Sequence, residues 1–223
     1  MGFSPVPLQQ RHLLLYAAFL ARSLKPTSIR SYLNIIGILH KEFGLPNPLL
    51  NNWSLQALLT GIKRAKGSPP NQKQPITTAL LHRIFATLNH RSSLDASFWA
   101  ICLVAFYGMF RKSHLLPTSA TRFDADKQLT KADITIQPWG ALVTIHWSKT
   151  IQFRERVVEI PLPRIPGSEI CPTSAIEHAV HFNSSSGARS QAFDWMEDRA
   201  PRIFTYKKFV TKLRHHLALC NVT

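Results

Sequence analysis

Apolar residues in the first third of the chain recur at the spacing of amphipathic helices. Residues 8–24 consist of good helix formers whose apolar positions fall on one side, so they predict a first helix. Pro26 is tolerated in the first turn of a second helix, and Gly44 can end that helix in the left-handed conformation. Residues 54–66 predict a third helix with one apolar face. The pattern therefore predicts a small helical domain over residues 1–66.

Residues 67–75 interrupt this pattern with glycine, proline and polar positions, which favour neither a helix nor an inner strand. We predict a linker there and a second domain over residues 76–223. A helix is expected to follow Thr77 and to reach Leu88. The apolar run at residues 98–110 is hydrophobic nearly all round, so it predicts a helix at the centre of a core.

The hydrophobic period changes from helix to strand spacing beyond Thr130. Alternating β-branched positions predict three antiparallel strands, at residues 134–136, 142–147 and 157–160. Helical patterns return at residues 174–182 and 206–219. We therefore expect a mainly α fold with a small antiparallel three-stranded sheet.

The charge balance is strongly basic. The 223 residues contain 27 Lys and Arg against 12 Asp and Glu, a net charge of +15, whereas the 45% of hydrophobic residues is ordinary for a folded protein. Residues 1–70 hold eight of these cations and one acid, Glu42. Such a field attracts polyanions, chiefly nucleic acid and less often an acidic membrane surface; a generally basic, solvated surface is the alternative. In the first domain the candidate phosphate contacts are Arg22, Lys25, Arg30, Lys63, Arg64 and Lys66.

Other classes of site lack their sequence pattern. The 3 cysteines are odd in number, far apart and without a CxxC pair, which argues against a disulfide framework or a zinc knuckle and fits a reducing compartment. There is no glycine-rich phosphate loop, and the His215–His216 pair lacks nearby metal partners. We therefore expect no cofactor and no metal, and place that pair on a surface or in a groove. The start of the chain lacks the layout of a signal peptide, and the longest apolar run, 13 residues, is too short to span a bilayer.

Four segments carry a family resemblance. They are YAAFLARSLKPTSIRSYLNIIGILHKEFG, FYGMFRKSHLLP, HWSKTIQ with VVEIPLP, and ICPTSAIEHAV, and together they cover most of residues 10–220. The chain resembles the tyrosine recombinases, or phage integrases, especially those of eukaryotic mobile elements. The resemblance implies a SAM-like core-binding domain over residues 1–66, a linker over 67–75 and an incomplete α+β catalytic domain over 76–223. The two domains would form the halves of a C-shaped clamp on duplex DNA.

In that family an arginine after a buried helix grips the scissile phosphate, and Arg111 holds the matching position. A guanidinium is always charged and binds two phosphate oxygens at once. Lys149 stands where the family places a hairpin lysine that protonates the leaving 5′-oxygen, and Arg154 and Arg156 are cationic surroundings able to lower its pKa. The family's acid three residues after the arginine is replaced here by His114. The alternatives are a capping or surface role for Arg111 and a solvated hairpin tip for Lys149.

The family's second catalytic cluster is a His-x-x-Arg stretch followed by a nucleophilic tyrosine. It is expected beyond Leu219, and the sequence ends at Thr223. Strand cleavage requires an activated hydroxyl, and no tyrosine stands in the family's nucleophile position. The four tyrosines are Tyr16, Tyr32, Tyr107 and Tyr206. The resemblance thus implies a nuclear protein that binds double-stranded DNA, is related to the integration and recombination of mobile elements, and does not cut DNA as this chain.

Two other functions fit the same sequence. The second hypothesis is a non-catalytic protein-interaction module that assembles with an intact recombinase and blocks it. Because the family works as tetramers, the resemblance also implies homo-oligomers or assembly with intact relatives. A third hypothesis is the binding of single-stranded DNA or RNA, but few aromatic residues stand in a strand pattern suited to base stacking.

Overall fold

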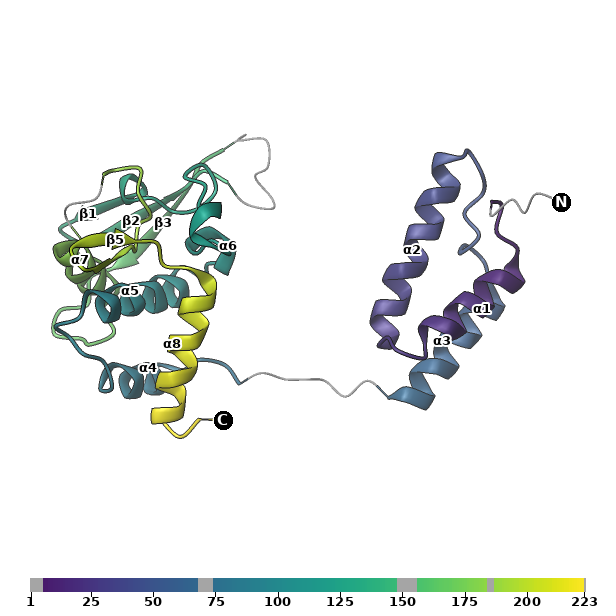
Figure 1. The fold of residues 1–223 in the computed structure, drawn as a ribbon, viewed down its shortest axis with the longest axis horizontal. Coiled ribbons are helices and arrows are strands. Elements are labelled where there is room, and N and C mark those ends of the chain that lie inside the picture. The colour runs from purple at the N-terminus through teal and green to yellow at the C-terminus, as the bar shows by residue number, and fades with distance from the viewer. Residues whose placement is uncertain (1–5, 68–73, 148–155, 184–186, 223) are drawn as a thin grey trace. The chain divides into compact units, whose positions relative to one another are not determined.

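The computed structural model describes residues 6–67, 74–147, 156–183 and 187–222. The chain divides into two compact units, Met1–Gln74 and Pro75–Thr223 (Figure 1). Each unit has its own cluster of buried apolar side chains. The boundary between the units falls inside the stretch for which the sequence predicts a linker.

Unit 1 is built from three helices, α1 (Gln10–Leu20), α2 (Pro26–Glu42) and α3 (Trp53–Lys66). The predicted start and end of the second helix are confirmed. Pro26 occupies the first turn of α2, and Gly44 follows the helix in the left-handed conformation with a φ of 67°. The core of the unit consists of Leu13, Ala17, Leu20, Ile29, Leu33 and Leu55. These side chains come from all three helices, so the helices bury one face each against the others.

The first helix is shorter than predicted. The prediction extended it to Leu24, but α1 ends at Leu20. The amide of Arg22 donates to Phe19 O, three residues back, so the chain tightens before the next helix. Lys25 is then extended, with a φ of −71° and a ψ of 149°, because the following proline ring disfavours helical geometry at the preceding residue.

Among the described residues, unit 2 contains the remaining α-helices and all the strands. In chain order they are α4 (Thr78–Phe85), α5 (Ser93–Tyr107), α6 (Lys112–Leu115), β1 (Ile134–Gln137), β2 (Gly140–Ile145), β3 (Val158–Pro163), α7 (Pro172–Phe182), β4 (Trp195–Glu197), β5 (Ala200–Arg202) and α8 (Tyr206–Leu219). Strands β1, β2 and β3 form one antiparallel sheet in sequence order, with Val143 opposite both Ile134 and Ile160. The fold is therefore mainly helical with a small antiparallel three-stranded sheet, as the sequence predicts.

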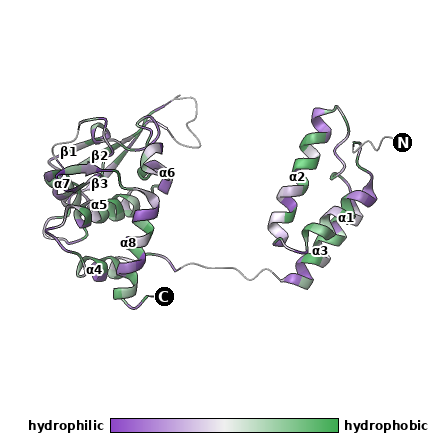
Figure 2. Ribbon diagram, in the orientation of Figure 1, coloured by the Kyte–Doolittle hydropathy of each residue, from purple (hydrophilic) through white to green (hydrophobic). Residues whose placement is uncertain are grey.

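Helix α5 is the centre of the unit 2 core. Every residue from Asp95 to Val104 is buried, and Figure 2 shows hydrophobic colouring along this helix. Helix α5 packs against α7 and against β4. The prediction of a central buried helix is confirmed, although α5 begins at Ser93, earlier than the apolar run. Ser92 causes the early start, because its side chain accepts a hydrogen bond from the Asp95 amide and caps the helix.

Several features of unit 2 differ from the sequence predictions. Helix α4 ends at Phe85 rather than at Leu88, and the short helix α6 was not predicted. The hairpin of β4 and β5 was not predicted, because its strands have three residues each and its turn places Asp198 and Arg199 at φ values of 50° and 64° without glycine. The expected surface position of the His215–His216 pair is wrong for His216, which is 2% exposed. Its ring stacks on Phe98 with a centroid separation of 5.2 Å, because α8 lays one face against α5.

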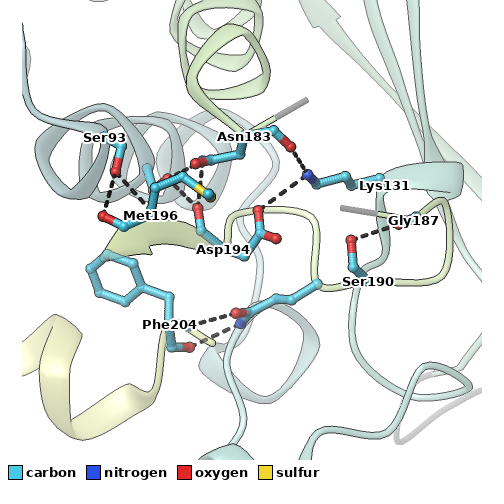
Figure 3. Close-up of polar contacts among 10 residues, drawn as sticks. Ser93, Lys131, Asn183, Gly187, Ser190, Asp194, Met196 and Phe204 are labelled. Carbon is cyan, nitrogen blue, oxygen red and sulfur yellow. Dashed lines mark hydrogen bonds and ion pairs between the residues drawn. The ribbon is translucent and has the colours of Figure 1, made fainter. Parts of the chain in front are cut away.

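A buried polar network joins five segments of unit 2 (Figure 3). Lys131 Nζ lies 3.2 Å from Asp194 Oδ1 and also donates to the carbonyl of Asn183. The Asn183 amide donates to Asp194 O at 2.6 Å and to Ser97 Oγ at 3.1 Å. Gln191 pairs with both backbone groups of Phe204, accepting from its N–H at 2.6 Å and donating to its carbonyl at 2.9 Å. These bonds hold the loop before β4 in place, since buried polar groups are stable only when paired.

Candidate nucleic-acid interface

An open groove of about 480 Å³ lies between α2 and α3 in unit 1. We call it the α2–α3 groove. Its lining consists of Pro26, Thr27, Arg30, Ser31, Asn34, Gln56, Leu59, Thr60 and Lys63. Two of these residues are cations and five are neutral hydrogen-bonding side chains, and no acid lines the groove. The lining therefore suits a negatively charged, hydrogen-bonding ligand.

The groove is polar because helix geometry sorts the residues of α2 and α3. On α2, Ile29 and Leu33 point into the core, while Thr27, Arg30, Ser31 and Asn34 share the groove side at i, i+3, i+4 and i+7. On α3, Leu55 is buried, and the next residue, Gln56, turns to the groove. The two walls meet in a hydrogen bond of 3.1 Å from Arg30 Nη2 to Gln56 Oε1. This bond holds the Arg30 guanidinium beside the groove.

The six cations proposed from the sequence are not all brought together. Arg30 and Lys63 line the groove. Lys66 Nζ donates to Leu24 O at 3.2 Å, which places the end of α3 beside the connection between α1 and α2. Arg22 and Lys25 lie exposed in that connection. Arg64 is exposed on α3 but does not line the groove.

The charge on this side of unit 1 is not compensated. Glu42 is the single acid in residues 1–74, and it is the last residue of α2. It lies twelve residues beyond Arg30, about 18 Å along the helix axis at 1.5 Å per residue. The groove instead contains Pro26 and Thr27 at the start of α2, where the helix dipole adds positive potential. A phosphate in the groove therefore meets only attractive charge nearby.

In unit 2, Arg111 lies in the turn between α5 and α6. It is exposed and occupies the position before the first residue of α6, with an extended backbone and no side-chain capping bond. The preceding turn is tight, because Met109 has a φ of 49° and the Phe110 ring covers Gly108. A Cβ on Gly108 would lie 2.3 Å from that ring and 2.9 Å from Val104 O. The backbone at Arg111 is thus held firmly, while its guanidinium faces solvent.

Of the two basic residues that follow Arg111 on α6, Lys112 adds positive charge to this surface and His114 does not. Burial, and then the charge of Arg111, lower the pKa of His114, so this histidine stays neutral at the pH where most proteins work. Lys112 Nζ lies 4.1 Å from the centre of the Tyr206 ring, a cation–π contact that joins α6 to the start of α8. The Tyr206 amide donates to Pro117 O at 2.9 Å. Tyr206 therefore packs against α6 and binds a neighbouring cation.

Lys149 and Arg154 lie outside the described residues. The strands on either side lead to a second cavity, of about 350 Å³, whose lining includes His146, Arg156 and Arg189. His146 Nε2 lies 3.1 Å from Asp133 Oδ1. Arg189 Nη2 lies 3.1 Å from Asp126 Oδ1. Because Asp126 and Asp133 line this cavity and contact its basic side chains, it is a weaker anion site than the α2–α3 groove, which no acid lines.

Sequence reasoning missed the contributions of Gln56, His146 and Arg189. Gln56 is 26 positions from Arg30, and Arg189 is 63 positions from Asp126, so no local spacing links either pair. The sequence did offer one signal for Gln56, because this polar residue directly follows Leu55, an apolar position of the predicted third helix. His146 lies inside the predicted second strand, directly after the end of β2, and carried no signal of its own.

The described part of the chain holds no group of three or more His, Cys, Asp or Glu placed to bind a metal ion. All three cysteines are buried and free. Among the described residues, no helix has the length and apolar character required to cross a bilayer.

Comparison with known proteins adds no relative: no family model matches the chain, and no curated protein matches it in sequence. The resemblance to tyrosine recombinases therefore stays a prediction from the segments quoted from the sequence.

Proposed function

We propose that this chain binds double-stranded DNA through the basic side of unit 1, as a nuclear protein related to the integration and recombination of mobile elements. The observation that carries the proposal is the α2–α3 groove, which combines Arg30 and Lys63 with hydrogen-bonding side chains and no acid. A cationic strip of this kind binds a phosphate backbone by releasing its condensed counterions.

The tyrosine-recombinase resemblance extends the proposal to the whole chain. Unit 1 takes the role of a SAM-like core-binding domain, and unit 2 that of a partial recombinase catalytic domain. Arg111 is a phosphate ligand in this proposal, supported by its exposed guanidinium on a firmly held turn. Strand cleavage is not part of it. Burial, and then the nearby Cys171, raise the pKa of Tyr107, which disfavours the phenolate that an attack on phosphorus needs.

The test is the salt dependence of duplex binding by the full chain. Replacing both groove cations, with Arg30→Gln and Lys63→Gln, is expected to weaken binding and to reduce the slope of log affinity against log salt by about two. The matched control, Arg11→Gln with Lys41→Gln, removes the same charge from positions that do not line the groove. It is expected to leave most of the slope unchanged. Failure of the parent chain to bind any duplex in dilute buffer refutes the proposal.

A second function, the protein-interaction module, is favoured by a different observation. Apolar side chains are exposed on the outer faces of α1 and α2: Leu15, Phe19 and Ile35 are each 61% exposed, and Ile38 is 58% exposed. Residues of this kind mark protein contacts when they lie close together. Co-purification with an intact tyrosine recombinase, lost on Ile35→Ser with Ile38→Ser, together with no binding to duplex DNA, would favour this function over the first.

A further inference from the structure

Ser23 lies exposed in the short connection between α1 and α2. It differs in this from the other hydroxyl side chains of unit 1. The serine and threonine residues within residues 6–67 are Ser23, Thr27, Ser28, Ser31, Ser54 and Thr60. All of them except Ser23 lie inside α2 or α3. Ser23 is therefore the hydroxyl of this described range that a modifying enzyme reaches without opening a helix.

The backbone around Ser23 is held by few bonds. The amides of Arg22, Ser23 and Leu24 donate to Phe19 O or Leu20 O at 3.0, 3.3 and 2.9 Å, so these bonds all lead to the last two residues of α1. Protein kinases bind the segment around the acceptor hydroxyl in an extended conformation. A short exposed turn opens at a lower free energy than a packed helix does, so this segment can adopt the conformation that a kinase requires.

Three cations surround this serine. Arg22 directly precedes it, Lys25 follows two positions later, and both are exposed. The third is Lys66 of α3, whose Nζ lies 3.2 Å from Leu24 O, beside Ser23 in the chain. Among residues 1–74 the single acid is Glu42, at the other end of α2. A serine between basic residues suits a kinase whose substrate groove is acidic, because kinases select substrates by charge pattern.

We propose that Ser23 is the phosphorylation site of a basic-directed serine kinase, and that its phosphate switches off the binding of duplex DNA. This inference rests on the proposed function and adds its regulation. In the transfer, Ser23 Oγ attacks the γ-phosphorus of an ATP molecule held by the kinase. The new O–P bond forms as the bond to the β-phosphate oxygen breaks, the hydroxyl proton passes to the kinase's base, and ADP leaves.

The phosphate acts on the charges that the DNA would use. A phosphoserine carries about −1.5 to −2 charges at pH 7 and has three strong acceptor oxygens. Arg22, Lys25 and Lys66 are three of the six candidate phosphate contacts of unit 1, and all three lie at this connection. A phosphate on Ser23 pairs with them in place of the DNA backbone and repels that backbone as well.

The first experiment tests the site. The folded full chain is incubated with ATP and the catalytic domain of protein kinase C, a basic-directed serine kinase, and the modified residue is identified by mass spectrometry. We expect phosphate on Ser23, none at this position in Ser23→Ala, and slower transfer in Lys25→Gln than in the control Lys41→Gln. A folded chain that acquires no phosphate on Ser23 overturns the proposal.

The second experiment tests the switch, with phosphoserine incorporated during synthesis of the full chain at Ser23 or, as the control, at Ser54. Ser54 lies twelve residues before Lys66 on α3, about 18 Å along the helix axis, so the control adds the same charge at a distance. Phosphoserine at Ser23 should reduce the salt slope of duplex binding by about two and the affinity by about 10-fold or more, and the control should change both less.

Equal losses for the two phosphorylated chains, or no loss for the one modified at Ser23, overturn the switch while the proposed function stands. If the unmodified chain binds no duplex at low salt, the proposed function fails and the switch fails with it. The mass spectrum decides separately whether Ser23 is a kinase site. Unfolding of each phosphorylated chain, followed by circular dichroism, distinguishes a local loss of binding from a loss of the fold.

Discussion

Two glycines of this protein differ sharply in how closely other atoms surround them. Gly108 and Gly187 both lie in connections of unit 2. A Cβ on Gly108 would lie 2.3 Å from the Phe110 ring, whereas a Cβ on Gly187 would lie within 4 Å of no atom of the described residues. Only the first glycine is therefore required by packing, and it shapes the turn that carries Arg111.

Gly108→Ala is expected to destabilise unit 2 by about 1–3 kcal/mol, the usual range for forcing extra volume into a packed site. Gly187→Ala, the control, should change stability little or raise it by about 0.4–1 kcal/mol, because alanine has fewer unfolded conformations. Urea denaturation followed by circular dichroism measures both. Equal effects of the two variants would contradict the packing role of Gly108.

The buried His216 makes unit 2 sensitive to acid. Burial, and then the charge of Lys212, lower the pKa of His216 below its ordinary value of 6.5; Asp95 opposes this shift, and His215 adds to it. Nδ1 pairs with Thr87 Oγ1 at 2.8 Å, while Nε2 is buried with no hydrogen-bond partner among the described residues. The folded state therefore holds a neutral ring, and the unfolded state takes up a proton first as the pH falls.

Stability contributed by neutral His216 is present above pH 6.5 and is lost as the pH falls below that value toward the folded-state pKa. His216→Gln should flatten the fall in unfolding free energy between pH 7.5 and pH 5.5. His215→Gln, the same change at the exposed neighbour, should leave the pH dependence of the unfolding free energy unchanged. The measurement is urea denaturation at four pH values, and an unchanged profile for His216→Gln would contradict the assignment.

At the scale of elements, sequence patterns predicted the existence of most helices and strands but few of the contacts between them. The last helix was predicted at residues 206–219, and α8 spans Tyr206–Leu219. The partners of its side chains were not predictable in the same way, because Lys212 pairs with the buried Asp95 of α5, more than a hundred positions away. The network around Lys131 is of the same kind and joins segments that share no local signal (Figure 3).

Lys131→Met is expected to destabilise unit 2 by about 3–5 kcal/mol, because it leaves the carboxylate of Asp194 buried without its cation. The two side chains are 13% and 4% exposed. Lys127→Met provides the control, since Lys127 forms a surface pair with Asp124 at 2.7 Å, worth about 0–1 kcal/mol. Thermal and urea denaturation of the two variants would show the difference. A loss below 1 kcal/mol for Lys131→Met would mean that the network is not needed for stability.

At the scale of the whole molecule, the two units have separate cores, and charge is unevenly distributed between them. Unit 1 has one acid in residues 1–74, whereas unit 2 contains eleven of the 12 Asp and Glu residues. Since each core is built from residues of one unit, each unit holds the contacts that a domain needs to fold alone. The groove proposed to bind DNA also lies within one unit.

A fragment of residues 1–74 is therefore expected to unfold cooperatively by itself and to retain duplex binding with most of the salt slope of the full chain. A fragment of residues 75–223 should also unfold cooperatively and bind duplex more weakly. Circular dichroism and binding at several salt concentrations measure these properties. An unfolded 1–74 fragment, or a slope carried mainly by 75–223, would contradict the division of roles.

The sequence by itself determined the helices of unit 1, the central helix and the three-stranded sheet, and the excess of positive charge. These depend on residues close together in the chain, such as the proline that opens α2 and the alternation in β2. Only the tertiary structure decided that Arg30 meets Gln56, that His216 is buried on Phe98, and that Lys131 lies beside Asp194. Each of these contacts joins segments far apart in sequence, so its existence depends on how whole elements pack rather than on any local pattern.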